Sequence, residues 1–352
     1  MKYKIVVFGT KQSTISLLDV IKHDVDLIVT IDNTTSHHIS GKGDVGHYAE
    51  IEDINCYSTS DYSLKSCQDF FENNEFEIGI SYGWQRLIPD YVLKRFKHGV
   101  FGTHASPLGL PYGKGRSPLN WSIIRGFEQV YFNLFKYVVK ADSGMMYSTT
   151  KFEINKWDTI DSIKMKDIIV TKKEVVNLIK DYKNDSIVLH PQRDDIEETF
   201  FPKRSPKDGK INLEWSCKDI YNLIRGVTRP FPGAFLMCGD MKVTIWDAVP
   251  FDNQLDFSDY VVGDIIKWEG NKFILKLVDN TLLVNDFDCE DLHKLEEVGN
   301  LRSRKMSFGG RLLETKTIVK NMEILITLII QERLGNIGVK RMMFYLFHLK
   351  NQ

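Results

Sequence analysis

Short apolar runs alternate with longer amphipathic stretches along the first 140 residues. Two β-rich runs, Ile5 to Phe8 and Leu27 to Ile31, flank a stretch from Thr14 to Lys22 whose apolar positions recur at helical spacing. The runs Ile78 to Ser81 and Gly99 to Phe101 continue the series, each preceded by a helix-sized segment. This alternation predicts strands joined by helices in an open α/β sheet with parallel strands.

Two further segments complete this first unit. The run Leu134 to Val139 predicts another strand, and the pattern from Lys172 to Tyr182 predicts a helix. Between His190 and Lys210 the composition shifts to charged residues, Pro and Gly, which is typical of a connecting segment. We therefore expect the first domain to cover residues 1–195.

Beyond this segment the pattern changes to one helix, Ser216 to Val227, followed by short alternating strands. These strands are Lys242 to Trp246, Val261 to Lys267, Lys272 to Val278 and Leu282 to Val284. Their spacing predicts a small β-barrel or sandwich at residues 196–310. Residues 311–352 have an apolar helical pattern, which we interpret as a tail that contacts a second copy in a homodimer.

Composition narrows the possible partners. The 352 residues include 46 Lys and Arg and 47 Asp and Glu, giving a formal net charge of -1. A nucleic-acid partner requires a basic surface, so we expect none.

The five cysteines form no CxxC pair, which favours reduced thiols and no metal site. Because no apolar run approaches the roughly 20 residues of a membrane span and no signal-like segment opens the chain, we expect a cytoplasmic protein without a membrane partner.

Two residues stand where an open α/β sheet places its ligands, beyond the carboxyl ends of the strands. His104 follows the run ending at Phe101 and precedes a loop rich in Pro and Gly, and an imidazole there can act as a general acid or base near neutral pH. Asp142 follows the run ending at Val139. If these strands are neighbours that end at the same edge, the carboxylate can reach the imidazole. Taken singly, such a histidine is more often structural, and such an aspartate is usually only a turn residue.

Five blocks of sequence extend this interpretation to most of the chain. They are ISYGWQRLIP (80–89), GTHASPLGLPYGKGRSPLNWSIIRG (102–126), DSG (142–144), FFPKRSPKDGKI (200–211) and IYNLIRGVTRPFPGAF (220–235). In this order they resemble the 10-formyltetrahydrofolate-dependent formyltransferases, which include methionyl-tRNA formyltransferase and the sugar N-formyltransferases. The resemblance implies an α/β fold: a Rossmann-like catalytic domain with an open, mostly parallel sheet, then a small OB-like β-barrel domain. The hydrophobic pattern adds the helical C-terminal tail.

The resemblance also implies functional residues, with 10-formyltetrahydrofolate as the formyl donor and no metal. His104 and Asp142 match the catalytic His and Asp, the first stabilising an oxyanion or relaying a proton and the second orienting the imidazole and accepting the proton of the amine. The residues expected to bind the folate are Tyr82, Gln85, Leu87, Ile88, Val139 and Asp142. Those expected to bind the acceptor are Thr103, Ser106, Tyr112, Lys114, Arg116 and Trp121, of which the two cations suit an anion and the aromatic rings suit stacking.

One position departs from the family pattern. The family has Asn two residues before the catalytic His, and this chain has Gly102 there. Thr103 faces the other side of the strand and cannot replace it. Loss of one oxyanion donor costs about a hundredfold in rate or more if nothing replaces it. We hypothesise that Asn120, Asn133, a backbone N–H or a water supplies the missing hydrogen bond.

Three functions follow, in order of preference. The first is an N-formyltransferase acting on the amine of a nucleotide-linked amino sugar, for the biosynthesis of a surface polysaccharide such as O-antigen. It is favoured because the loop at residues 32–50 is poor in Lys and Arg, and because GRSPLNW and TRPFPGAF resemble the sugar enzymes. The second is a methionyl-tRNA formyltransferase. The third is a catalytically impaired relative that binds folate or a partner.

Overall fold

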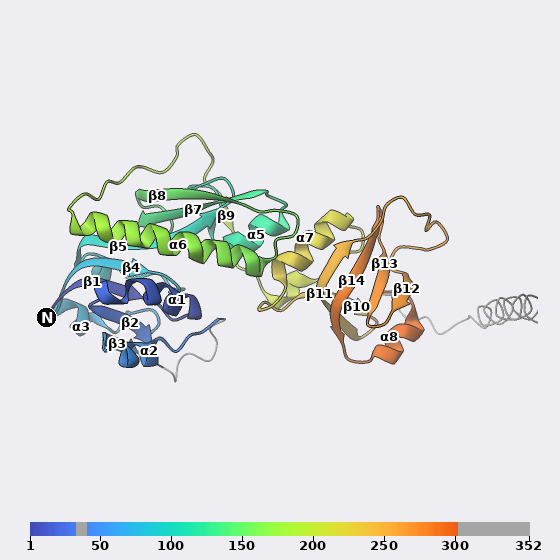
Figure 1. The fold of residues 1–352 in the computed structure, drawn as a ribbon, viewed down its shortest axis with the longest axis horizontal. Coiled ribbons are helices and arrows are strands. Elements are labelled where there is room, and N and C mark those ends of the chain that lie inside the picture. Colours follow the sequence, from blue (N-terminus) through green and yellow to red (C-terminus); the bar gives the residue numbers. More distant parts are fainter. Residues whose placement is uncertain (33–40, 302–352) are drawn as a thin grey trace, which may run out of the picture. The chain divides into compact units, whose positions relative to one another are not determined.

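A computed structural model describes residues 1–32 and 41–301 (Figure 1). The tail expected at residues 311–352 lies outside the described residues, so its helical character and its role in a homodimer stay predictions. The described chain contains two large sheets, one of seven strands and one of five. None of the helices in the described ranges is long and apolar enough to cross a membrane.

The larger sheet is open and mostly parallel, as the sequence predicts. Its strands in spatial order are β3 (Asn55–Thr59), β2 (Leu27–Ile31), β1 (Lys2–Phe8), β4 (Glu75–Ser81), β5 (Phe96–Ser106), β7 (Gln129–Lys136) and β8 (Met146–Glu153). The pairs from β3 to β5 are parallel. The pairs β5 with β7 and β7 with β8 are antiparallel.

Helices cover both faces of this sheet because its central strands are apolar on both sides. The helices are α1 (Gln12–Ile21), followed by the short η1 (Lys22–Asp24), then α2 (Val45–Ile51), α3 (Gln68–Glu72), α4 (Asp90–Leu93), α5 (Pro118–Ile124) and α6 (Ile160–Lys183). On one face, Ile5 and Val7 of β1 share a core with residues of α1 and α6. On the other, Val6 and Phe8 pack with Phe71 of α3 and with α4. Figure 1 shows α6 running along the sheet.

The structure corrects the sequence interpretation at the strands that carry the site. Strand β5 continues to Ser106, so His104 lies within the strand and not beyond its end. The strand predicted from Leu134 to Val139 is β7, which ends at Lys136 and runs antiparallel to β5. The predicted reason for the meeting of His104 and Asp142, two strands ending at one edge, is therefore wrong.

Other elements were missed or cut short. Strand β3 has no fully buried position, so it lacks the apolar run that marks a central strand. The sequence pattern also did not predict helix α2, strand β8 or strand β10. Helix α6 begins at Ile160, twelve residues before the predicted start, because its first half carries polar and apolar residues without a clear stripe.

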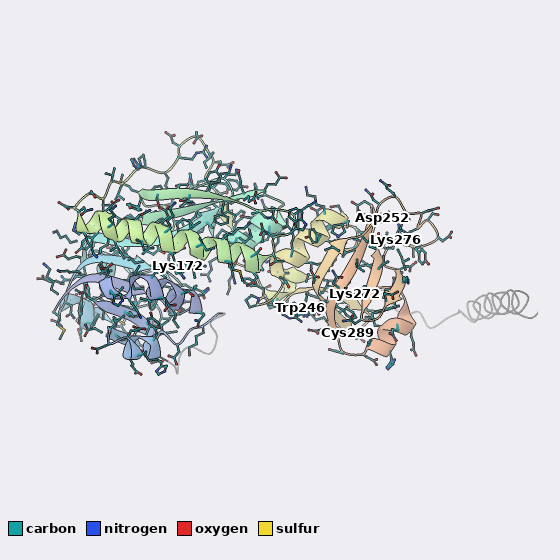
Figure 2. The ribbon with its side chains drawn as sticks, in the orientation of Figure 1. Lys172, Trp246, Asp252, Lys272, Lys276 and Cys289 are labelled. Carbon is teal, nitrogen blue, oxygen red and sulfur yellow. The ribbon has the colours of Figure 1, made fainter. Side chains whose placement is uncertain are left out.

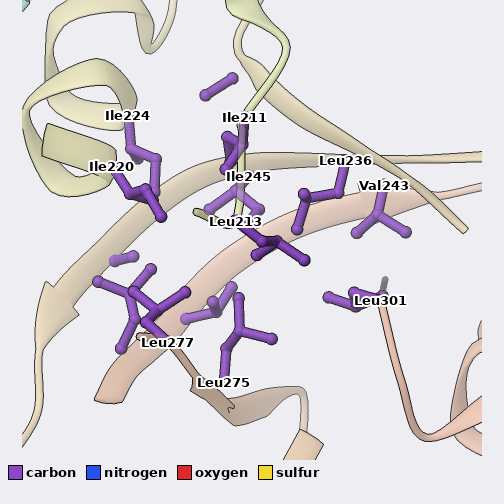
Figure 3. Close-up of a cluster of buried hydrophobic side chains, with 14 of the residues drawn as sticks. Ile211, Leu213, Ile220, Ile224, Leu236, Val243, Ile245, Leu275, Leu277 and Leu301 are labelled. Atoms are coloured by element: carbon purple, nitrogen blue, oxygen red, sulfur yellow. The ribbon is translucent and has the colours of Figure 1, made fainter. Parts of the chain in front are cut away.

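The smaller sheet is antiparallel. Its spatial order is β10 (Ala234–Cys238), β11 (Met241–Pro250), β14 (Thr281–Cys289), β13 (Lys272–Lys276) and β12 (Ile265–Glu269). Helix α7 (Cys217–Val227) packs against it, and α8 (Leu292–Val298) follows the last strand. Figure 3 shows Ile220 and Ile224 of α7 meeting side chains of the strands, among them Ile245 and Leu275. This arrangement confirms the predicted small β-domain, which is barrel-like.

The alternation of buried and more exposed residues along β13 explains why the sequence pattern predicts strands in this region. Phe273 and Leu275 are fully buried, whereas Lys272 and Lys276, labelled in Figure 2, are exposed or half-buried. One face of the strand thus joins the core and the other meets solvent.

Between α6 and the first strand of the smaller sheet, the chain pairs with the loop that follows β5. A two-stranded parallel pair joins β6 (Lys114–Gly115) to β9 (Phe200–Phe201), and η2 (Pro206–Gly209) follows. The segment at residues 190–201 is therefore part of the framework around the site. The domain limits at residues 195 and 310 stay predictions.

Candidate active site

His104 projects from β5 in a nearly dry environment, with 8% of its surface exposed. Its Nε2 lies 2.8 Å from the carbonyl oxygen of Gly113. A carbonyl only accepts, so Nε2 donates a hydrogen bond and carries a proton. Its Nδ1 faces Asp142, with 3.5 Å between Nδ1 and Oδ1. The structure thus brings together the two residues that the sequence marked as the catalytic pair.

Asp142 reaches the histidine because the loop after β7 turns back on the strand. Lys136 N–H donates to the carbonyl of Met145 at 2.9 Å, closing the loop. A Cβ on Gly144 would lie 1.6 Å from the carbonyl oxygen of Lys136, so this closure requires glycine. Asp142 itself adopts the left-handed region, at φ 52°. Its Oδ2 accepts a hydrogen bond of 3.0 Å from the Gly115 N–H, which fixes the carboxylate.

The segment at residues 192–201 holds this arrangement from outside. Gln192 Nε2 donates to the carbonyl oxygens of Asp142, at 2.8 Å, and Gly144, at 3.0 Å. Thr199 Oγ1 accepts from the Gly113 N–H at 2.9 Å. The carbonyl that binds His104 and the loop that carries Asp142 therefore share one support. This segment was read from sequence only as a connector, because its charge and Pro content give no sign of these contacts.

Lys114 is buried between these loops. Its ammonium donates to Glu198 Oε1 at 2.6 Å and to Ser143 Oγ at 2.8 Å. Hydrogen bonds from Lys114, the larger effect, and from Lys140 hold the pKa of Glu198 below its usual range. In this structure Lys114 therefore fastens Ser143 beside Asp142, and its contact with an acceptor stays a prediction.

The residues expected to bind folate lie on two loops that leave the sheet at the same level. Ser81, the last residue of β4, pairs with Gly102, which pairs with Phe135 of β7. The loops after β4 and β7 thus start on either side of β5, just before His104. Leu87 on the first loop and Val139 on the second expose 70% and 68% of their surface. Large apolar side chains so exposed form a surface suited to a flat apolar ligand.

The other residues of the predicted folate set are either buried or already have a hydrogen-bond partner. Gln85 is exposed, and its carbonyl lies 3.4 Å from Arg116 Nη1. Ile88 is buried in the core beneath the loop. Tyr82 is buried, and its hydroxyl donates to Asp167 Oδ2 at 3.3 Å. These two side chains support the loop from within.

Four of the residues expected to bind the acceptor are buried or half-buried among other groups of the protein. Thr103 is half-buried on the face of β5 opposite to His104. Ser106 is fully buried and donates to the carbonyl of Tyr112 at 2.6 Å. Tyr112 and Trp121 both contact the ring of Phe201, and Trp121 Nε1 donates to the carbonyl of Pro202. These contacts are structural, and an additional role in binding the acceptor stays a prediction.

The two asparagines proposed as oxyanion donors are both buried and engaged. Asn120 Nδ2 donates to the carbonyl of Gly226 in α7 at 2.8 Å. Asn133 lies directly opposite His104 on β7. Its Nδ2 donates to the carbonyl oxygens of His104, at 2.9 Å, and Tyr131, at 3.0 Å, which uses both amide hydrogens.

A cluster of cations, which the sequence did not reveal, lies at the same edge of the sheet. Lys11 precedes the first residue of α1, and its pKa is lowered to about 8 by burial and by the positive charges of Lys164 and Arg116. We call these three residues the basic cluster. Residues 11 and 164 are remote in sequence, and only the packing of α6 beside α1 brings them together. Two positive charges close enough to lower the pKa of a third cation form a site that is suited to bind an anion.

Asp167 accompanies this cluster from α6. Burial raises the pKa of its carboxyl to about 6, against the opposing effects of the Tyr82 hydrogen bond and the Lys164 charge. Among residues 1–32 and 41–301, no three His, Cys, Asp or Glu side chains come together in a way that could hold a metal ion.

Comparison with known proteins identifies the fold. Residues 203–297 match the family described as "Formyl transferase, C-terminal domain". The structure is similar to that of a HypX variant from Aquifex aeolicus, with 13% identity and a TM-score of 0.60, over 88% of this chain and 51% of that chain. The chain therefore spans about half the length of HypX.

Two further structures match nearly end to end. One is an N-formyltransferase from Helicobacter canadensis in complex with folinic acid and dTDP-3-aminofucose, with 17% identity and a TM-score of 0.60, over 81% of this chain and 99% of that chain. The other is a methionyl-tRNA formyltransferase from Clostridium thermocellum, with 18% identity and a TM-score of 0.51, over 79% and 99%. These matches show the formyltransferase fold and confirm the resemblance identified in the five sequence blocks.

Proposed function

We propose that this protein is a folate-dependent N-formyltransferase that moves a formyl group from 10-formyltetrahydrofolate to the amine of a nucleotide-linked amino sugar. The observation that carries the proposal is the His104 and Asp142 pair, joined at 3.5 Å and supported on both sides by backbone hydrogen bonds. A pair held so rigidly, next to two loops with exposed apolar side chains, is suited to catalysis on a bound substrate.

The residues around the pair fit a folate. Leu87 and Val139 offer an apolar surface to a pterin ring on either side of β5. The chain from Gln85 to Leu87 is exposed, so main-chain groups of Arg86 and Leu87 can contact its polar edge, whereas both main-chain groups of Gln85 already have partners. The folate supplies the activated formyl group, and the side chains of this chain position it and manage the protons.

The reaction is an acyl transfer from one nitrogen to another. The amine attacks the formyl carbon, and the carbonyl electrons move to oxygen, forming a tetrahedral oxyanion. The pair can hold the amine's proton between Nδ1 of His104 and the Asp142 carboxylate. The carbonyl then re-forms as the bond to the folate nitrogen breaks, and that nitrogen receives the proton. The products are the N-formyl amine and tetrahydrofolate, and no covalent bond to the protein is needed.

The basic cluster supports an anionic substrate. A diphosphate near Lys11, Lys164 and Arg116 would compensate three charges of the same sign at the edge of the sheet. The Helicobacter canadensis enzyme binds an amino sugar linked to a nucleotide diphosphate, and its whole length matches this chain. An overall charge of -1 favours such a compact anion over tRNA. Methionyl-tRNA formyltransferase remains the alternative, since an enzyme of that kind has the same fold.

The proposal is tested by incubating the protein with 10-formyltetrahydrofolate and a panel of nucleotide-linked amino sugars, with product masses as the readout. We expect at least one sugar to gain 28 mass units, about the difference between an amine and its formamide, when the acceptor fits the site. His104→Asn should lower kcat by about a hundredfold to ten-thousandfold, the usual contribution of a positioned acid or base.

His98→Asn is the matched control, because His98 lies on the same strand and its ring packs against Tyr182, away from the pair. It should leave kcat unchanged. Formylation of charged initiator tRNA, with no sugar accepted, would overturn the sugar assignment. Full activity of His104→Asn would overturn the assigned mechanism.

A further inference from the structure

The place of the missing asparagine side chain is filled by a tyrosine from another strand. A Cβ built on Gly102 would lie 2.1 Å from both the hydroxyl oxygen and Cζ of Tyr137. Atoms that are not bonded to each other do not approach so closely. Tyr137 therefore occupies the space that a side chain at residue 102 would need. The glycine and the tyrosine are therefore two parts of one arrangement.

Tyr137 stands on the same face of the sheet as His104. Residues two apart on a strand share a face, so Gly102 and His104 face the same side. Gly102 pairs with Phe135 across the ladder, and Tyr137 comes two residues after it. The Tyr137 N–H donates to the carbonyl of Val100 at 2.7 Å, which extends the pairing beyond the end of β7. The ring then leans back over Gly102.

The surroundings of Tyr137 hold a neutral phenol in place. Its ring packs against that of Phe135, with 5.3 Å between the centroids. Burial, the larger effect, and the negative charge of Asp142 raise the pKa of its hydroxyl to about 12, against a lowering by the Ser81 hydroxyl beside it. The phenol thus keeps its proton at neutral pH and can donate a hydrogen bond. Because the charge of Asp142 acts on this pKa, the phenol lies in the neighbourhood of the His104 and Asp142 pair.

The alternatives named from the sequence are less well placed. Both amide hydrogens of Asn133 already bind carbonyl oxygens, and the amide of Asn120 joins α5 to α7. Turning either amide toward a substrate would leave a buried carbonyl without its partner, at a cost of about 1 to 3 kcal/mol.

We propose that the Tyr137 hydroxyl is the oxyanion donor of this enzyme, in the position that an asparagine side chain at residue 102 would take. This inference rests on the proposed function. The hydroxyl donates a hydrogen bond to the formyl oxygen as it becomes an oxyanion, and it keeps its own proton throughout. A residue two positions before His104 lies about 7 Å along the strand. Side chains leaning together from these positions can contact the same small group.

The test is Tyr137→Phe, which removes one oxygen and preserves the ring packing. We expect kcat to fall about a hundredfold or more, as for loss of one oxyanion donor, while KM for the folate changes less than threefold. Binding of 5-formyltetrahydrofolate, measured by titration, should be unchanged. Tyr147→Phe is the matched control, since that hydroxyl binds Asp181 on α6, and it should leave kcat unchanged.

A second pair of variants tests the exchange of positions. Tyr137→Ala should lose as much activity as Tyr137→Phe or more, and adding Gly102→Asn to it should restore at least tenfold, because the asparagine can then enter the vacated space. A Tyr137→Phe enzyme with kcat within threefold of the wild type would overturn this inference and leave the proposed function intact. A wild-type protein that formylates neither a sugar nor a tRNA would overturn the proposed function, and this inference with it.

Discussion

At the residue scale, the buried carboxyl of Asp167 makes stability depend on pH. Its pKa is raised to about 6 by burial, so between about pH 4 and pH 6 the folded protein binds more protons than the unfolded chain. Stability therefore falls as pH rises through this window. From the shift of about 2 units the loss is at most about 3 kcal/mol.

Asp167→Asn should remove this loss. The amide oxygen still accepts the hydrogen bond of Tyr82, but it carries no charge to bury. We expect the variant to melt at a higher temperature than the wild type at pH 7.5, with the two converging at pH 4. Thermal unfolding at several pH values measures this. Asp259→Asn, at an exposed site, should show no such difference, and an Asp167→Asn effect of equal size at both pH values would contradict the account.

At the element scale, the loop after β7 carries Asp142, the carboxylate that we propose takes part in catalysis. Gly144→Ala would put a methyl group 1.6 Å from the carbonyl of Lys136, so the loop must open. We expect a loss of about 1 to 3 kcal/mol in stability. Asp142 should also move away from His104, and displacement of a catalytic group by about 1 Å costs about a hundredfold in rate.

Thermal unfolding and kcat together check this expectation. Gly46→Ala in α2 is the matched control, because a Cβ there has open space around it and should leave kcat unchanged without lowering stability. Wild-type kcat in the Gly144→Ala variant would show that the closure of the loop does not position Asp142.

The elements also show how far the sequence could be followed. Buried strands such as β1, β2 and β4 were found because their apolar runs are continuous, which is the mark of strands covered on both faces. The direction of β7 could not be found, since a strand has the same periodicity in either direction. For that reason His104 and Asp142 were paired correctly by family resemblance but with the wrong geometric reason.

The remaining parts of the site depend on contacts remote in sequence. Nothing local marks Tyr137 as a neighbour of Gly102, because the ladder between β5 and β7 sets that contact. The same is true of Lys11 and Lys164, which meet through helix packing. The motifs therefore indicated that His104 and Asp142 form a pair, whereas the charged and polar groups around that pair could be found only from the fold.

At the scale of the whole molecule, α7 packs against the smaller sheet and contacts the segment that leads into α6. We call this contact the joint, and Arg225 lies in it. The side chain is 7% exposed, and its Nη1 donates to the carbonyl oxygens of Asn155, at 3.0 Å, and Asp158, at 2.7 Å. Its Nε donates to Asn222 on the same helix. One guanidinium thus satisfies two buried carbonyls of the segment that leads into α6.

Arg225→Met should weaken this joint while keeping most of the apolar packing. The two carbonyls lose their donor, and each unsatisfied buried group costs about 1 to 3 kcal/mol, so the melting temperature should fall by several degrees. If the joint couples the two sheets, calorimetry should also resolve two transitions in place of one. Arg229→Met is the matched control, since that arginine is exposed and its ion pair with Asp286 is worth about 1 kcal/mol or less. Equal effects of the two substitutions would mean that Arg225 contributes no more than a surface charge.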